Sequence, residues 1–253
     1  MSVLEASSER GVVTLRMVDV ERRNALSAQM LRGLVGAFDI AEADATNRIV
    51  VLTNEGNTFC AGADLRERVE GTPAPRLDEL FARISHSRLV VVGHINGHCV
   101  AGGVGLAAAL DISIAREDVT FGFSEVRLGL APAIISVVCL TKMRDADARA
   151  AMLRANRFDA REAARVGLIT SAVPADELEA AVNDVVGDLL AGEPHALAET
   201  KELLRRVPRM DTEDAYRSAI EVSSRLFASD AAREGMSAFL EKRPARWAPR
   251  DDH

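Results

Sequence analysis

Glu125 is the carboxylate whose surroundings point most clearly to chemistry. It lies in the mainly apolar stretch of residues 121–130 (FGFSEVRLGL). Removal from water disfavours the charged form of a carboxyl group, so this setting raises its pKa toward the range of a useful general acid or base. An ion pair with Arg127, or the capping of a turn, would explain the same residue without catalysis. Both interpretations stay open on these residues alone.

Two segments rich in small residues could offer backbone N–H groups to a ligand. Residues 58–65 (TFCAGADL) form a predicted loop that holds Gly62, which allows a turn that points the next N–H group outward. Residues 96–105 (NGHCVAGGVG) follow a predicted strand and open a predicted helix, where free N–H groups favour negative charge. Tight packing alone would explain either segment. The second lacks the glycine spacing of a dinucleotide-binding loop and the Gly-Lys-Ser/Thr of a phosphate-binding loop.

These segments need a framework, and the hydrophobic pattern predicts an α/β core. Apolar or alternating runs predict strands, and periodic apolar residues between them predict helices. The predicted strands are residues 3–7, 12–18, 49–53, 90–95, 111–115 and 169–173. The predicted helices are residues 28–45 with Ser27 as N-cap, 77–87, 106–110, 134–140, 145–155, 160–166, 174–190, 194–206, 213–228 and 230–241. The two prolines within residues 72–76 predict a mobile connection.

The alternation of strands and helices ends near residue 145, and helices dominate beyond it. We therefore expect a core over residues 1–190 and a C-terminal helical region over residues 191–253.

Composition narrows the classes of function. A net charge of -7 argues against a general nucleic-acid binder, and no apolar run is long enough to cross a bilayer. Cys60, Cys99 and Cys139 are widely spaced among apolar or small neighbours, which predicts buried free thiols and no metal site. Early acids and the lack of an apolar signal core predict a cytoplasmic protein. We expect no nucleic acid, membrane or metal among its partners.

Taken together, the segments resemble the crotonase family, also called the enoyl-CoA hydratase/isomerase family. The resemblance covers almost the whole chain. Its ordered motifs are RRNAL at residues 22–26, AGADL at 61–65, the Asn-Gly to Gly-Gly segment that starts at 96 and ends in Asp111-Ile112, and EG with FLEKR between 234 and 243.

The resemblance implies that Ala63 and Gly102 bind the thioester oxygen of an acyl-CoA through their backbone N–H groups. Enolate chemistry puts negative charge on that oxygen, and a preformed donor aimed at it is worth about 2.7–4 kcal/mol in comparable enzymes. Glu125 matches one of the two catalytic glutamates of hydratases. Further substrate contacts are implied for Arg22, Ala25, Ala61, Asp64, Leu65, Arg66, Gly105, Leu128 and, from a neighbouring subunit, Lys242. Arg22 and Arg66 are the candidates for the coenzyme A phosphates, and no separate cofactor is expected.

Gly105 is the main departure from the family pattern, because hydratases carry their second glutamate there. Three interpretations remain open: a hydratase in which Glu125 handles both proton transfers through one water, a delta3-delta2 enoyl-CoA isomerase, and a non-catalytic acyl-CoA-binding protein. Residues 121–133 resemble hydratases of branched or carboxylated substrates such as 3-methylglutaconyl-CoA, which favours the first. We expect Gly105 to open space for a bulky or polar substituent, whose carboxylate would meet His98 or Arg127.

For the fold, the resemblance implies an α/β protein with a crotonase-like ββα superhelix core and a C-terminal helical trimerisation region. It also implies a homotrimer, or a hexamer made of two trimers. The Ala-rich helical tail is compatible with both.

Overall fold

The larger of two sheets forms the centre of the protein. The structure, a computed structural model, describes residues 2–71 and 76–249, so most of the predicted connection at 72–76 lies outside the described residues. β1 runs antiparallel to β2, and the other neighbouring strands are parallel. In spatial order the strands are β1 (Leu4–Glu9), β2 (Val12–Met17), β3 (Ile49–Asn54), β5 (Val90–Ile95), β7 (Ile112–Arg116) and β10 (Ser171–Val173).

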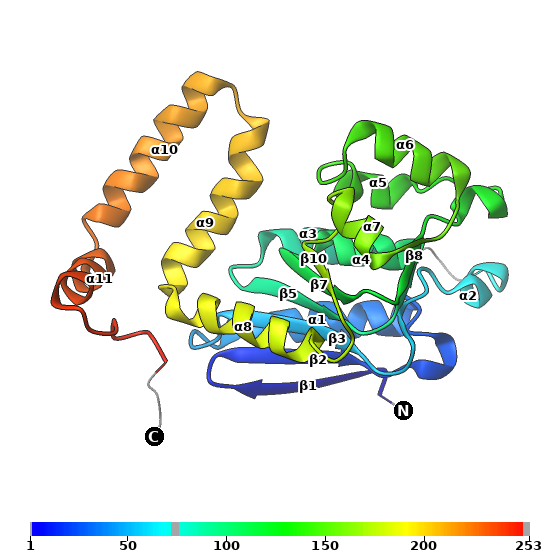
Figure 1. The fold of residues 1–253 in the computed structure, drawn as a ribbon, viewed down its shortest axis with the longest axis horizontal. Helices are drawn as coiled ribbons and strands as arrows, with labels where there is room; N and C mark the ends of the chain where they lie inside the picture. The colour runs from blue at the N-terminus through cyan, green and yellow to red at the C-terminus, as the bar shows by residue number, and fades with distance from the viewer. Residues whose placement is uncertain (1, 72–75, 250–253) are drawn as a thin grey trace.

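Helices cover both faces of this sheet (Figure 1). All six residues of β3 are buried, as its continuous apolar run predicts. Val50 and Leu52 face a core shared with α1 (Ala28–Ala43), α3 (Leu77–His86) and α4 (Gly102–Ala109). On the other face Ile49 and Val51 pack against α8 (Leu178–Ala191).

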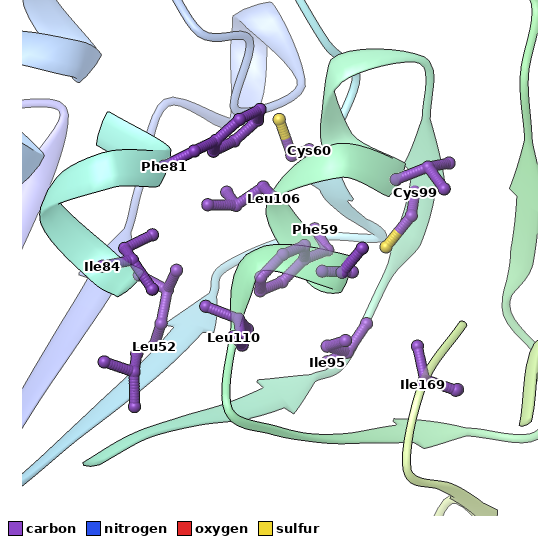
Figure 2. Close-up of a cluster of buried hydrophobic side chains, with 14 of the residues drawn as sticks. Leu52, Phe59, Cys60, Phe81, Ile84, Ile95, Cys99, Leu106, Leu110 and Ile169 are labelled. Carbon is purple, nitrogen blue, oxygen red and sulfur yellow. The ribbon is translucent and has the colours of Figure 1, made fainter. Parts of the chain in front are cut away.

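The helix α4 is the innermost helix of the fold. Its side chains are small or apolar, and seven of its eight residues are buried. Figure 2 shows Leu106 and Leu110 directed among side chains of the sheet and of α3, with Phe81 reaching toward α4. The position of α4 is therefore fixed on several sides by packing.

A second, smaller sheet consists of very short strands that the sequence analysis did not predict. β4, β6 and β8 are parallel neighbours, and β9 pairs with β8 in antiparallel orientation. Strands of two or three residues carry no recognisable alternation, and the first two lie within segments interpreted as loops. The strands are β4 (Thr58–Cys60), β6 (His98–Val100), β8 (Thr120–Gly122) and β9 (Phe158–Asp159).

Most predicted helices are confirmed within a few residues of their ends. The predicted cap at Ser27 is also confirmed, because its Oγ accepts a hydrogen bond from the Met30 N–H at 3.1 Å. The remaining helices are α2 (Leu65–Val69), α5 (Ala133–Cys139), α6 (Asp145–Arg154), α7 (Ala160–Arg165), α9 (Pro194–Arg206), α10 (Thr212–Phe227), α11 (Asp230–Glu241) and the 3-10 helices η1 (Val20–Arg22), η2 (Glu125–Leu128) and η3 (Val207–Arg209).

The C-terminal helices α9, α10 and α11 extend from one end of the core (Figure 1). Lys201 ties α9 to the core, because its buried Nζ lies 2.6 Å from Asp111 Oδ2. The α/β architecture and the helical C-terminus are confirmed, whereas the boundary at residue 190 stays a prediction. Cys60, Cys99 and Cys139 are buried free thiols, as predicted.

Candidate active site

The carboxyl ends of three neighbouring strands bring the chemically suggestive segments together. Ala63 follows β4, Gly102 follows β6 and Glu125 follows β8, and these three strands are parallel. The loops that follow parallel strands meet at one edge of a sheet. A hydrogen bond of 2.9 Å from the Ala101 N–H to the Gly122 carbonyl joins two of these loops. The residues selected from sequence therefore share one edge of the smaller sheet.

Gly62 lets the loop after β4 lie directly against the start of α4. Its φ of +87° favours glycine, and an added Cβ there would lie 2.8 Å from the backbone nitrogen of Gly102. An added Cβ at Gly102 would in turn lie 3.5 Å from the backbone nitrogen of Ala63. The backbone nitrogens of Ala63 and Gly102 are thus close neighbours.

The N–H groups of Ala63 and Gly102 are both free to meet a ligand. Gly102 is the first residue of α4, where no carbonyl of the helix can accept its hydrogen. The preceding Ala101 has φ 50° and ψ -117°, a strained conformation for a residue that has a Cβ. Neither N–H donates a hydrogen bond within residues 2–71 and 76–249. Two such donors could stabilise negative charge on one ligand oxygen.

Glu125 begins the helix η2 with one carboxylate oxygen left unpaired. Its Oε2 is buried and has no hydrogen-bond partner in the described part of the chain. Burial raises the pKa of the Glu125 carboxyl, and interactions with the backbone at Glu125 and Ser124 oppose that shift only in part. Arg127 is exposed and does not pair with Glu125. Because proteins rarely bury an unsatisfied carboxylate oxygen, Glu125 is suited to exchange a proton with a bound ligand.

The expectation that Gly105 opens space beside the ligand is wrong. An added Cβ there would lie 2.8 Å from the Cβ of Ile135 on α5 and 3.1 Å from the ring of Phe81 on α3. Ile135 is itself buried. These two side chains fill the volume that a side chain at position 105 would take, so a second carboxylate there would require Ile135 to move.

The expectation that His98 meets a ligand carboxylate is also wrong. His98 starts β6, whereas the site lies beyond the other end of that strand. Its Nδ1 accepts a hydrogen bond of 3.0 Å from the Thr120 N–H at the start of β8. The imidazole is therefore held at the opposite end of β6 from the site, and of the two residues proposed only Arg127 lies near Glu125.

Residues 22–26 line the loop that follows β4. The Ala61 N–H donates to the Arg23 carbonyl at 3.1 Å, and the Leu26 N–H donates to the Gly62 carbonyl at 2.7 Å. Ala25, which stands between Arg23 and Leu26 in the sequence, is buried. The motif therefore supports the backbone beside Ala63.

Charged residues around α2 divide into paired and unpaired groups. Asp64 caps this helix, since its Oδ1 accepts the Arg66 N–H at 2.9 Å, and its Oδ2 lies 3.3 Å from the Arg22 guanidinium. The Arg66 side chain is exposed and forms no ion pair with any described residue, and Leu65 is also exposed. Of the two arginines expected at the coenzyme A phosphates, Arg66 is the free one.

Two further residues from the sequence analysis lie at the surface. Leu128 is exposed on η2, three positions beyond Glu125. Lys242 ends α11, which lies at the opposite end of the molecule from α2 (Figure 1). Lys242 of this chain is therefore not brought to the site of the same chain.

The sequence analysis gave no role of its own to Asn24, which organises the site. It is buried with φ 51°, and its Nδ2 donates to the carbonyls of Glu55 at 3.1 Å and Thr58 at 2.8 Å, on either side of a turn. A signal was available, because asparagine adopts the left-handed region more readily than other side chains do. Ile135 was also missed, and no local pattern connects it with Gly105.

Neither a metal centre nor a membrane span is found among the described residues. Within 2–71 and 76–249 no three His, Cys, Asp or Glu side chains gather as ligands would. None of the helices there has the length and apolar character needed to span a bilayer.

Comparison with known proteins gives consistent matches over the whole chain. A family model described as Enoyl-CoA hydratase/isomerase matches residues 7–250. A Thermus thermophilus protein with a provisional enoyl-CoA hydratase name is 35% identical over 249 residues, which cover 94% of this chain and 98% of that one. The 2,3-dehydroadipyl-CoA hydratase of Escherichia coli is 29% identical over 96% of this chain and 97% of its own length. The solved structure of an enoyl-CoA hydratase from Mycobacterium smegmatis is 31% identical with a TM-score of 0.90, and the match covers 97% of this chain and 98% of that one.

Proposed function

The chain belongs to the enoyl-CoA hydratase/isomerase family of enzymes, and we propose that it adds water across the double bond of a 2-enoyl-CoA. In this proposal the N–H groups of Ala63 and Gly102 bind the thioester oxygen. Glu125 is the single carboxylate that moves protons. The observation that carries the proposal is that the buried Oε2 of Glu125 has no hydrogen-bond partner among the described residues. Glu125 follows β8, the strand adjacent to β6, which precedes Gly102.

The reaction uses one water and one carboxylate. Glu125 takes a proton from water while the hydroxide oxygen bonds to C3, and the electrons of the double bond move to the thioester oxygen. The two N–H groups stabilise that enolate. Glu125 then returns its proton to C2, which restores both the carboxylate and the thioester. A raised pKa suits this cycle, because the group must gain and lose a proton near neutral pH.

The acyl group of the substrate is proposed to be branched or to carry a carboxylate. Family membership does not choose it, since the relatives' names specify different thioesters, among them 2,3-dehydroadipyl-CoA and carnitinyl-CoA. Gly105 gives no support, because Ile135 and Phe81 fill the space beside it. The Arg66 side chain is exposed and forms no ion pair within residues 2–71 and 76–249, which supports its role at a coenzyme A phosphate, whereas Arg22 pairs with Asp64.

The assembly proposed is a homotrimer or a hexamer of two trimers in the cytoplasm. Exposed apolar side chains on α10 and α11 support contacts between subunits, namely Tyr216, Ile220, Phe227, Met236, Phe239 and Leu240. Lys242 would then reach the site of a neighbouring subunit. Three free thiols are compatible with a reducing compartment.

The decisive experiment compares hydration of linear, branched and carboxylated 2-enoyl-CoAs by the wild type and by Glu125→Gln. We expect the variant to lose at least about 100-fold in kcat and to keep its affinity for a saturated acyl-CoA. Glu221→Gln, an exposed change on α10, is the matched control and should behave as wild type. Equal turnover by Glu125→Gln would contradict the assignment.

Isomerisation of a 3-enoyl-CoA is the second candidate, and one observation favours it. A double-bond shift needs a single proton carrier, and Ile135 leaves no room for a second carboxylate at position 105. Adding a 3-enoyl-CoA to the same assay separates the two reactions. Binding without turnover of any of these thioesters would instead indicate an acyl-CoA-binding protein.

A further inference from the structure

A large groove lies between α3, α5 and α9, at the C-terminal end of α4. Its volume is about 870 Å³, and most of its lining is apolar. Phe81, Ala109, Ile134, Val137 and Leu204 are among the residues that form its walls. The fold leaves this volume unfilled within the described chain, although α9 is tied to the core next to it by Lys201.

The helix α4 links the active site to this groove. Gly102, Gly105 and Ala109 are spaced three and four residues apart, so they lie along one face of the helix. Gly102 is at the site, and Ala109 lines the groove. Between them, Ile135 and Phe81 cover Gly105. The site and the groove are thus consecutive along one helix face, separated by two side chains.

A partly buried ammonium group lies at the far end of that face. Lys142 lines the groove, and its Nζ donates to the carbonyl of Leu110, the C-cap of α4, at 2.7 Å. Oδ2 of the nearby Asp111 contacts Lys201 Nζ at 2.6 Å and accepts a hydrogen bond from the Val91 N–H at 2.7 Å. Lys142 forms no ion pair with any described residue, although the Asp111 carboxylate acts on it electrostatically. Asp78, Arg205 and Arg209 also line the groove. An anion in the groove could accept a charge-assisted hydrogen bond from Lys142 Nζ.

We propose that the groove takes the distal part of the substrate's acyl chain, and that Lys142 binds a carboxylate at the end of that chain. Ile135 and Phe81 close the space beside Gly105 between the site and the groove, so both side chains must move aside for the acyl chain to pass. The eight residues of α4 span about 12 Å, which sets the length scale of the chain that fits. The proposal rests on the proposed function, because it names the substrate class of the same site.

Burial gives Lys142 a reason to recognise an anion. Desolvation lowers the pKa of its ammonium group, and the Asp111 carboxylate opposes that shift. A carboxylate bound to Nζ would favour the charged form further and would use donors that the Leu110 carbonyl leaves free. A simple cap on the last carbonyls of α4 is the competing role for Lys142.

The test measures kcat/KM for two series of 2-enoyl-CoAs of increasing chain length, one ending in methyl and one in carboxylate. We expect the wild type to prefer the carboxylate series by at least tenfold once the chain spans α4. In Lys142→Met this preference should fall at least tenfold. Arg154→Met, which removes an exposed charge on α6, is the control and should leave the preference unchanged. Arg127→Met tests the cation next to Glu125.

Several outcomes would overturn the inference. One such outcome is a wild type that does not prefer the carboxylate series. Another is a preference that Arg127→Met abolishes and Lys142→Met leaves intact. A third is a Lys142→Met variant whose Tm falls while its preference for the carboxylate series is unchanged, since Lys142 would then act only as a cap of α4. A fourth is a Lys142→Met variant whose molar mass in solution changes while its preference for the carboxylate series does not, since a second copy of the chain would then occupy the groove.

A binding measurement separates this inference from the proposed reaction. Saturated acyl-CoAs with and without a terminal carboxylate are titrated into the wild type and Lys142→Met by calorimetry. A carboxylate preference that depends on Lys142 supports the inference even when no thioester is hydrated. Hydration of short chains without that preference contradicts the inference and leaves the proposed function intact.

Discussion

At the scale of single residues, Glu125 combines a functional advantage with a cost in stability. Its folded-state pKa is raised by burial, so the folded protein holds this proton more tightly than the unfolded chain does. Below the unfolded pKa of about 4.3 both states are protonated and the residue costs nothing. As pH rises from the unfolded pKa through the folded pKa, the folded state loses stability relative to the unfolded one, and above the folded pKa this loss is constant.

Glu125→Gln is therefore expected to raise Tm at neutral pH by a few degrees while it removes catalysis. The gain should shrink as pH falls through the raised pKa and vanish near the unfolded pKa. Thermal unfolding of both proteins between pH 4 and pH 8 measures it. A gain that is constant over this range would mean that burial of the charge is not its origin.

Single residues also mark the limit of what the sequence could predict at the site. The raised pKa of Glu125 could be predicted, because its apolar neighbours are adjacent in sequence. The environment of Gly105 could not, because Ile135 and Phe81 reach it from two other helices. His98 was misassigned because the sequence did not predict β6, whose first residue it is, at the end of the strand away from the site.

At the scale of elements, the site depends on the close approach of α4 to β4. A Cβ added at Gly103 would lie 2.7 Å from the carbonyl carbon of Cys60 and would overlap its oxygen. Gly103→Ala should therefore lower the free energy of unfolding by about 1–3 kcal/mol. It should also reduce kcat by displacing the Gly102 N–H. Gly187→Ala on α8, where a Cβ meets no atom within 4 Å, should instead stabilise by about 0.4–1 kcal/mol.

Denaturant unfolding and the hydration assay check this pair. If Gly103→Ala changes neither the free energy of unfolding nor kcat, α4 and β4 tolerate separation. The backbone geometry proposed for the two N–H donors would then lose its support.

The contact of α4 with α5 makes a second prediction at this scale. Gly105→Ala should overlap Ile135, and Ile135→Ala should leave a cavity that costs about 2–5 kcal/mol. In the double variant the new methyl group enters the space that Ile135 vacates. The loss of stability should therefore be smaller than the sum of the single losses by about 0.5–3 kcal/mol. Additive losses in urea unfolding would show that the two residues do not contact each other.

Elements were predictable where periodicity was long and were missed where it was short. The strand over 90–95 matches β5 at both ends because most of its residues form one apolar run. The helix over 194–206 matches α9, which starts at Pro194 and is capped by Glu193. β4 and β6 were missed, because three residues show no period and their pairing lies with distant segments. The small sheet that positions the site is thus the part of the fold that local patterns describe least.

At the scale of the whole molecule, the C-terminal helices present an apolar face that nothing in the described chain covers. On α11 Met236, Phe239 and Leu240 lie three and four residues apart, and Phe239 is 83% exposed. Phe239→Asp should dissociate the proposed trimer at micromolar concentration, because it puts a charge into the contact. Ser237→Asp adds the same charge beside this face and should leave the assembly unchanged. Light scattering after gel filtration measures both, and a wild type that is monomeric would refute the proposed assembly.

The distance between α11 and α2 gives the proposed assembly a catalytic consequence. Lys242 lies at the opposite end of the molecule from the site of its own chain, so it can act on substrate only in a neighbour's site. Lys242→Ala should then raise KM by about tenfold, the loss of one charge-assisted contact of roughly 1.4 kcal/mol. Glu125→Gln chains lack turnover but carry an intact Lys242. In mixed oligomers the Lys242 of a Glu125→Gln chain should reach the site of a neighbouring Lys242→Ala chain, whose Glu125 is intact. The KM of that site should then return to the low value of the wild type. Titrating one variant into the other before the assay measures this rescue. If KM stays high at every ratio, Lys242 does not serve a neighbouring subunit.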